Sequence, residues 1–391
     1  MHLIDSYYKQ MNLIAKITLL ICSGLLLVSL PIAFWWMLAA QTWIGKAIGI
    51  IGLLLVAFPL LIALHAQQRI GKRILKGVTA LFLLLLIGVF IAVLLRTPTG
   101  VPVADSPVQH RFWGESTFKR YTVANMIPEI EQINLGFMLM PYFDPILTPK
   151  QAGDAASFTI PLYQEMEQDE NFHTLGSAMG QAYNDFLGLP FQRDHYYLYI
   201  PEYQPTKPLP AIVFLHGSAG NFKTYTWVWS KLAEAQGVVI IAPSYGFGNW
   251  DEDGVAAVLS AIEDAQQTVA IDPNQIYLAG LSNGGLGVSR LATEHPDLFA
   301  GLIFISPVMA TDIVDGAAFH SQWAQRPVLV ISGDADRRIP IAYVERRVAN
   351  LRDGGVDVTT VIYPNIDHFL FFAEPDRILD DISIWLAPVR E

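Results

Sequence analysis

A serine stands between two glycines at residues 280–284, in the order Gly280-Leu281-Ser282-Asn283-Gly284. An apolar run at 276–279 precedes this motif, and a segment with a helical pattern follows it. In that setting a G-x-S-x-G motif forms a sharp strand-to-helix turn that exposes the serine hydroxyl. The glycines are required because a Cβ atom there would collide with the neighbouring strand or helix. We therefore expect Ser282 to be a nucleophile; a structural serine in a Gly-rich turn is the alternative.

Two acidic residues and a histidine follow this serine along the chain. Asp334 and Asp336 come after the apolar run 328–331, and His368 lies in a loop after the run 356–363. A carboxylate can hold a histidine in the tautomer that accepts a proton. The order serine, acid, histidine is typical of hydrolases with a G-x-S-x-G turn. The sequence predicts that His368 is the general base for Ser282, and it leaves both aspartates open as the acid.

A fourth element is the loop Leu215-His216-Gly217-Ser218, which directly follows the apolar run 211–215. Backbone amides on such a loop can stabilise the oxyanion of an acyl-transfer reaction, and each donor contributes about 2.7–4 kcal/mol. We expect the amides of Ser218 and Asn283 to form this oxyanion hole. His216 is expected to be a structural residue that braces the loop.

Residues 191–391 contain the elements that must position these groups. Short apolar runs alternate with helical patterns, which is typical of a parallel sheet with helices on both faces. Ligands of such sheets bind beyond the carboxyl ends of the strands. The predicted strands are 196–200, 211–215, 238–242, 276–279, 301–305, 328–331 and 356–363, and the predicted helices are 222–235, 254–270, the segment after Ser282, 341–351 and a last helix from Glu374.

This region, roughly residues 190–391, resembles the α/β-hydrolase fold family. The resemblance rests on the His-Gly loop, the 280–284 motif, the pattern Gly333-x-x-Asp336-x-x-Ile339-Pro340 and His368. It implies a Ser-Asp-His triad with Asp336, rather than Asp334, as the acid. The stretch 282–285, Ser-Asn-Gly-Gly, and the stretch 291–299 are most similar to esterases and serine peptidases of the prolyl-oligopeptidase and polyhydroxyalkanoate-depolymerase type.

The N-terminal part of the chain has a different character. Three apolar runs without charged residues, 17–40, 47–64 and 77–95, lie close to the length that crosses a membrane as a helix, and we expect residues 1–95 to be a three-helix transmembrane segment. Basic residues crowd the link 69–76, whereas the link before it carries only Lys46. The positive-inside rule then predicts a cytoplasmic N-terminus and an extracytoplasmic catalytic domain.

Residues 96–190 connect these two parts. The Pro-rich stretch 96–110 is expected to be an extended linker. Residues 111–190 are expected to be an N-terminal extension or a cap over the active site. Prolines at 128, 141, 145, 149 and 161 predict that no long helix crosses 128–161, and a helix is predicted over 173–187.

Charge and cysteine content exclude several function classes. Residues 1–100 carry eight of the 25 basic residues and one of the 36 acidic residues, so residues 101–391 have a net charge of −18. So acidic a domain is a poor partner for nucleic acid. The one cysteine, Cys22, lies in the first apolar run, and no zinc-type spacing of Cys and His occurs. We expect neither a metal nor a cofactor.

Together these features predict a membrane-anchored serine hydrolase that cleaves carboxylic esters through an acyl-enzyme intermediate, with apolar or lipid-like esters as expected substrates. A serine peptidase is the nearest alternative, because ester and amide cleavage share this machinery. A non-catalytic membrane receptor that has kept the fold is the third.

Overall fold

The computed structural model describes residues 33–66, 70–202 and 207–389, together with scattered helical positions between residues 13 and 31. The chain forms two compact units. Unit 1 consists of Met1–Thr97 and Met126–Leu135, and unit 2 of Pro98–Asn125 and Gly136–Glu391. One boundary falls inside helix α5 (Glu129–Phe143). The first residues of α5 therefore belong with helices that lie much earlier in the sequence.

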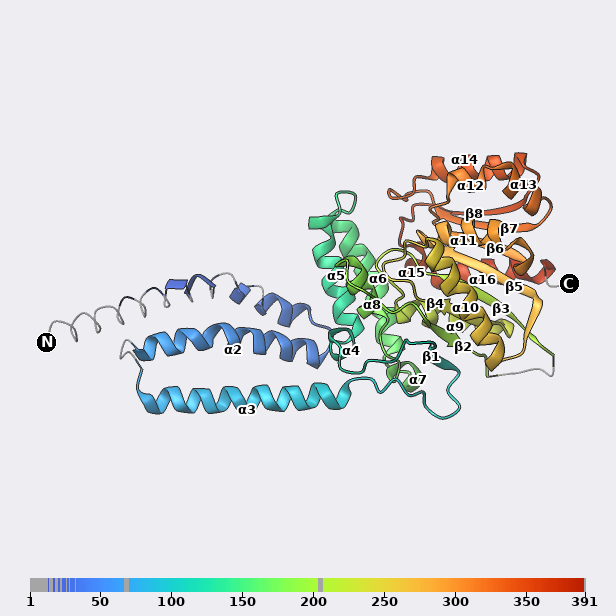
Figure 1. Cartoon of the computed structure of the whole chain (residues 1–391). Helices are drawn as coiled ribbons and strands as arrows, with labels where there is room; N and C mark the ends of the chain where they lie inside the picture. The colour runs from blue at the N-terminus through green and yellow to red at the C-terminus, as the bar shows by residue number, and fades with distance from the viewer. Residues whose placement is uncertain are drawn as a thin grey trace. The chain divides into compact units, whose positions relative to one another are not determined.

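Unit 1 is built on two helices, α2 (Trp43–Ala66) and α3 (Lys72–Arg96), which run side by side (Figure 1). The rings of Phe58 and Phe82 stack between them at a centroid distance of 5.4 Å. The carboxylate of Glu131 lies at the start of α2, where its Oε1 accepts hydrogen bonds from the amide and the hydroxyl of Thr42 at 2.6 and 2.7 Å. Donors at the start of a helix have no acceptors within the helix. The buried carboxylate of Glu131 supplies an acceptor for them.

Two segments of unit 1, Trp43–Ile62 and Lys72–Arg96, are long and apolar enough to cross a membrane. Their leucines face outward; Leu84 is 69% exposed and Leu95 is 77% exposed. These helices coincide with the predicted spans 47–64 and 77–95. Six positions of the predicted span 17–40 lie outside the described residues, Cys22 among them, and a shorter apolar helix, Ser23–Ala39, occupies much of this range. The basic residue Arg69 also lies outside the described residues. Among the described residues, two helices are therefore long and apolar enough to be candidate spans, whereas the sequence predicts three.

Unit 2 contains an eight-stranded sheet with the order β1-β2-β4-β3-β5-β6-β7-β8. The first two strands pair antiparallel, β2 also pairs antiparallel with β4, and the remaining pairs are parallel. The strands are β1 (Val108–Phe112), β2 (His195–Tyr199), β3 (Leu209–Leu215), β4 (Val239–Pro243), β5 (Ile271–Leu281), β6 (Gly301–Ile305), β7 (Pro327–Gly333) and β8 (Asp357–Tyr363).

Helices cover both faces of this sheet, as the alternating pattern predicts (Figure 1). On β3, Val213 and Leu215 pack into a core formed with α10 (Glu252–Thr268), α11 (Gly284–Glu294) and α14 (Ile341–Asp353). The intervening Phe214 faces α9 (Lys223–Gln236), where its ring lies 5.4 Å from that of Trp229. Helix α16 (Pro375–Val389) covers the same face through Trp385, whose ring lies 6.0 Å from that of Tyr277.

Shorter helices complete the structure around the sheet. They are α4 (Val123–Met126), α6 (Pro149–Met166), α7 (Glu170–His173), α8 (Met179–Phe186), η1 (Pro296–Leu298), α12 (Thr311–Val314), α13 (Ala317–Trp323) and α15 (Leu370–Ala373).

The structure differs from prediction mainly in residues 96–190. The expected linker 96–110 is shorter, because β1 begins at Val108 and pairs with β2. The expectation that prolines exclude long helices across 128–161 is wrong, since α5 and α6 occupy most of that range. Pro149 is the first residue of α6, where an amide hydrogen has no helical partner in any case. Pro141 and Pro161 lie inside helices, and each removes only one hydrogen bond.

Of the helix predicted over 173–187, α8 occupies 179–186, whereas α7 ends at His173 and residues 174–178 are not helical. The break falls near Gly176, where an added Cβ atom would lie 2.0 Å from the ring of Phe118. A distant aromatic side chain therefore packs where a continuous helix would need space.

Candidate active site

Ser282 lies in a sharp turn between β5 and α11 with a backbone φ of +51°, a conformation that non-glycine residues rarely adopt. The neighbouring glycines make this turn possible. A Cβ atom on Gly280 would lie 2.6 Å from the carbonyl carbon of Gly284, and one on Gly284 would lie 2.1 Å from the carbonyl oxygen of Leu215. The turn is thus pressed against β3, as the motif predicts.

Three side chains meet at this turn. The Oγ of Ser282 lies 3.0 Å from Nε2 of His368, and Nδ1 of His368 lies 2.8 Å from Oδ2 of Asp336. A carboxylate can only accept, so Nδ1–H of His368 donates to Asp336 and Nε2 is left to accept the serine proton. The strands β5, β7 and β8 carry these residues just beyond their carboxyl ends. The arrangement has the geometry of a nucleophile, a base and an orienting acid.

The two aspartates left open by the residue pattern have different surroundings. Asp336 is 4% exposed, and its Oδ1 accepts hydrogen bonds from the amides of Arg338 and Ile339, each at 2.8 Å. Asp334 is exposed, and its Oδ1 accepts from the amide of Asn365 at 2.6 Å. Asp336 is therefore the carboxylate in contact with His368, while Asp334 bonds the loop that carries the histidine.

The His-Gly loop lies directly against Ser282. A Cβ atom on Gly217 would lie 3.2 Å from both the carbonyl oxygen of Leu281 and Cβ of Ser282. The backbone amides that follow Gly217 do not all have the same kind of partner. The amide of Ala219 donates a hydrogen bond to the carbonyl oxygen of Phe247 at 3.1 Å. Within the described part of the chain, the amides of Ser218 and Asn283 donate to no other group. Both expected oxyanion donors thus remain available.

His216 braces this loop from inside the protein, as expected. Its Nε2 accepts a hydrogen bond from the amide of Tyr245 at 3.1 Å, so Nδ1–H donates to the carbonyl of Gly217 at 2.8 Å. Complete burial lowers the pKa of His216 to about 4, because the charged form would lose its hydration. The imidazole is therefore neutral at pH 7 and holds one tautomer.

Sequence reasoning missed the residues that hold the histidine loop in place. Gln151 lies in the first turn of α6, where Thr148 and Gln151 form a capping box, and its Nε2 donates to Oδ2 of Asp367 at 2.5 Å. The other oxygen of Asp367 accepts from the amide of His368 at 2.7 Å. Phe137 of α5 packs edge-on against the ring of Phe369 at 5.6 Å. Residues expected to form an extension or cap thus contact both neighbours of His368.

Helix α8 supports the other side of the site. A Cβ atom on Gly220 would lie 2.7 Å from Cβ of Ala182 and 3.5 Å from Sδ of Met179. Asp185 of the same helix accepts a hydrogen bond from the amide of Phe247 at 2.6 Å. One short helix therefore packs against both loops beside the oxyanion donors. Across the described residues, no cluster of three or more His, Cys, Asp or Glu side chains is arranged to hold a metal ion.

Comparisons with known proteins find similarity between part of this chain and several hydrolases. Residues 206–326 match a family model described as serine aminopeptidase, S33, a range that includes Ser282 and ends before Asp336 and His368. A poly(3-hydroxybutyrate) depolymerase of Ralstonia pickettii is 30% identical over 133 residues, 27% of each chain. An esterase of Mycobacterium tuberculosis is 32% identical over 97 residues, 25% of this chain and 32% of its own. Dipeptidyl-peptidase 5 of Porphyromonas gingivalis is 25% identical over 219 residues, 44% of this chain and 32% of its own.

The chain spans about a third or less of the length of these relatives. The similarity therefore covers only part of each relative. Mostly parallel pairing, helices on both faces and a serine turn after β5 are the marks of that domain in this structure. The chain accordingly carries a domain of the α/β-hydrolase fold that is similar to enzymes of the esterase and peptidase type.

Proposed function

We propose that this protein is a membrane-anchored serine hydrolase that cleaves carboxylic esters, with Ser282, His368 and Asp336 as its catalytic triad. The observation that carries this proposal is the continuous hydrogen-bonded chain from Ser282 Oγ through His368 to Asp336. A non-catalytic receptor would gain nothing from holding a serine in a strained turn at this point.

In the proposed mechanism, His368 Nε2 takes the proton of Ser282 as Oγ attacks the carbonyl carbon of the ester. The amides of Ser218 and Asn283 donate hydrogen bonds to the resulting oxyanion. The tetrahedral intermediate collapses, and His368 returns the proton to the departing alkoxide, which leaves as the alcohol. Water then attacks the acyl-enzyme by the same route, releasing the carboxylic acid and restoring the serine. No metal ion or cofactor takes part in these steps.

The choice of an ester over a peptide bond rests on the relatives. The two that are named for ester cleavage have the higher identities, 30% and 32%, against 25% for the dipeptidyl-peptidase. A peptidase is the second candidate, because the matched family model is that of a serine aminopeptidase. The triad serves both reactions, so the difference must lie in the substrate pocket.

Membrane anchoring through α2 and α3 forms part of the proposal, and their outward-facing leucines support it. The C-terminal end of α5 supports an apolar or lipid-like substrate, since Tyr142 and Phe143 are 82% and 81% exposed there. The alternative is that this helix packs against the hydrolase domain. That alternative fits Phe137, which is buried against Phe369. It does not fit the two exposed aromatic residues.

The catalytic domain is proposed to face away from the cytoplasm. Lys72, Arg73 and Lys76 begin α3, and Lys46 is the one basic residue in the link between the first and second apolar runs. A protease added outside intact cells should then cut between residues 97 and 107. Cleavage that requires a broken membrane would reverse this orientation.

The decisive experiment uses the full chain in detergent. A fluorophosphonate probe should label Ser282, and turnover should be compared between nitrophenyl esters of increasing acyl length and aminoacyl nitroanilides. Faster cleavage of esters, rising with acyl length, supports the proposal. Labelling with faster cleavage of the anilides would make the protein a peptidase, and absence of labelling would remove the catalytic assignment.

A further inference from the structure

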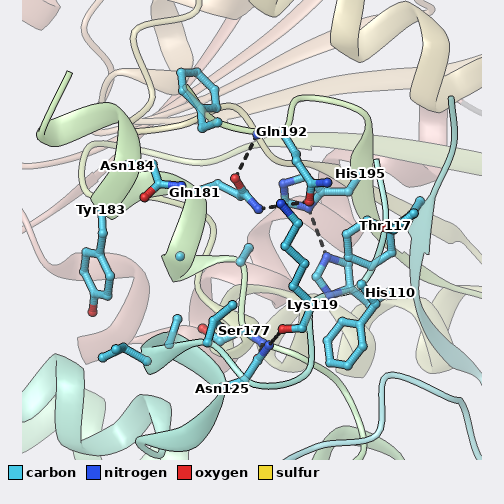
Figure 2. A pocket seen from close by; sticks show the side chains of 18 of the residues that line it. His110, Thr117, Lys119, Asn125, Ser177, Gln181, Tyr183, Asn184, Gln192 and His195 are labelled. Atoms are coloured by element: carbon cyan, nitrogen blue, oxygen red, sulfur yellow. Dashed lines mark hydrogen bonds between the residues drawn. The ribbon is translucent and has the colours of Figure 1, made fainter. Parts of the chain in front are cut away.

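Unit 2 contains a cavity of about 380 Å³ that is separate from the triad (Figure 2). It lies among β1, β2, α8 and the loop 117–125. None of the triad residues and no residue of the loop 216–220 lines it. Its volume is in the range of small-molecule sites in proteins. The cavity therefore has the size of a ligand site without being part of the proposed active site.

The lining of this cavity has an unusual charge balance. Nineteen residues line it, and none of them is an aspartate or glutamate, although residues 101–391 have a net charge of −18. Lys119 is the one Lys or Arg residue among them, and its side chain extends across the cavity in the view of Figure 2. Its ammonium forms no ion pair with any residue that the structure describes. The cavity is thus a local site for negative charge in an acidic domain.

Neutral hydrogen-bonding groups make up much of the remaining surface. His110 Nε2 and His195 Nδ1 are 3.0 Å apart at one end of the cavity, and burial lowers the pKa of both histidines well below 6.5. Neither imidazole therefore adds charge at pH 7. Asn184 lines the cavity from α8, and its side-chain amide has no hydrogen-bond partner among the described residues. This amide and Lys119 leave donors unused.

Aromatic rings supply an apolar part. Phe112, Phe118 and Phe191 line the cavity together with the polar groups. A charged donor, neutral amides and aromatic surface in one cavity suit a molecule with an anionic end and an apolar body.

We propose that this cavity binds a small organic anion, a monocarboxylate that carries an apolar group, at a site distinct from the triad. The carboxylate lies near Lys119 and Asn184, and the apolar group contacts the phenylalanine rings. Helix α8 forms part of the cavity wall through Gly180, Gln181 and Asn184, while Ala182 of the same helix contacts the loop at Gly220.

Isothermal titration calorimetry of the full-length Ser282→Ala protein in nonionic detergent tests this site. Phenylacetate is the probe, and phenylacetamide is its neutral counterpart of the same shape. A ligand of this size should bind with a Kd of about 1 mM, and the neutral amide should bind several-fold more weakly. Added salt should weaken the binding of phenylacetate only.

Two variants locate the site. Lys119→Gln should weaken the binding of phenylacetate about two- to fivefold, as expected for one partly exposed charge, and should leave phenylacetamide unaffected. Asn184→Leu, a tolerated change on a helix, should weaken phenylacetate about tenfold. Lys207→Gln is the matched control, since Lys207 is exposed and does not line the cavity.

Equal affinities for the acid and the amide would overturn the assignment of an anion, and no heat of binding at about 10 mM phenylacetate would overturn the site. Unchanged binding in both variants would also overturn the site. Wild-type protein blocked at Ser282 by a fluorophosphonate should bind as the free protein does; loss of binding there would assign the probe to the active site. These measurements require no turnover, so they are independent of the proposed reaction.

Discussion

Unit 1 and unit 2 use the same apolar residue types in opposite ways. In unit 2 the strand residues Ile303 and Phe304 are completely buried between two layers of helices. In unit 1 the helix residues Leu84 and Leu95 are largely exposed, on a helix that is long and apolar enough to cross a membrane. A buried core needs partners within the chain, whereas an exposed apolar helix needs apolar surroundings. Under the proposed function, unit 2 carries the chemistry and unit 1 anchors it to a membrane.

The largest effect should come from Ser282→Ala. If the chemistry belongs to unit 2 through this serine, ester turnover should fall by about 10⁶-fold, as in other enzymes that lose a triad serine. Ser218→Ala is the matched control, because the proposed role of Ser218 uses its backbone amide, and its turnover should stay near that of the wild type. The measurement is turnover of a soluble nitrophenyl ester by both variants. Comparable losses in the two would contradict the assignment.

The next effect should separate the two aspartates. Asp336→Asn should lower kcat by about 10⁴-fold, since an amide in contact with His368 favours the wrong tautomer. Asp334→Asn should lower it less than about tenfold, because the amide oxygen can still accept from Asn365. Steady-state kinetics of the two variants at pH 8 measures this. The reverse ranking would transfer the role of the acid to Asp334.

A third test measures how the unfolding free energy of unit 2 depends on pH. Burial lowers the pKa of His216 to about 4 and that of His195 to about 3, whereas both titrate near 6.5 in the unfolded chain. The unfolded chain therefore binds more protons below pH 6.5, so stability is complete above that pH and is lost as pH falls toward about 4. His216 alone accounts for about 3 kcal/mol of this loss. Urea unfolding at pH 7, 5.5 and 4.5 should show the decline.

A His195→Gln variant provides the control for this test. Its side chain cannot take up a proton, so its unfolding free energy should depend less steeply on pH between 6.5 and 4. An equal slope in the variant and the wild type would show that the acid sensitivity lies elsewhere.

The smallest effect on activity should come from Glu131→Ala in unit 1. Loss of the carboxylate leaves the amide and hydroxyl of Thr42 without their acceptor, at a cost of about 1–2 kcal/mol. Amide exchange in the first turn of α2 should then rise about tenfold in detergent. Turnover of a short soluble ester should not change, and Glu115→Ala on the surface of unit 2 should change neither quantity. Reduced ester turnover in Glu131→Ala would contradict the division of roles.

The sheet and the candidate triad could be predicted because their signals are local. Each strand of 191–391 is an apolar run with a turn or helix on either side, and the glycines around Ser282 reflect contacts with the adjacent strand and helix. The order serine, acid, histidine then selected His368, and the resemblance to the α/β-hydrolase family, through Gly333-x-x-Asp336-x-x-Ile339-Pro340, selected Asp336 over Asp334. Their catalytic roles stay predictions until the variants are measured.

The parts that sequence reasoning missed depend on distant pairings. Gln151 and Asp367 are separated by 216 positions, and His110 and His195 by 85. No periodicity or spacing connects such residues, because their contact exists only after the sheet has formed. The prolines led to a wrong prediction for a related reason. A proline in the first turn of α6 is favourable, and the cost of a proline farther along a helix is offset by the packing of that helix against other elements.

Gln151 has a consequence for how this enzyme should fail on heating. Its side chain both closes the first turn of α6 and binds the loop that carries His368, so fraying of a single helical turn removes one of the contacts that hold this loop. Helix ends open with far smaller free energies than the core of a sheet. We therefore expect activity to decline at temperatures where the sheet is still intact, and to return at once on cooling. In that regime the working temperature of the enzyme is determined by one turn of helix rather than by the melting of its core.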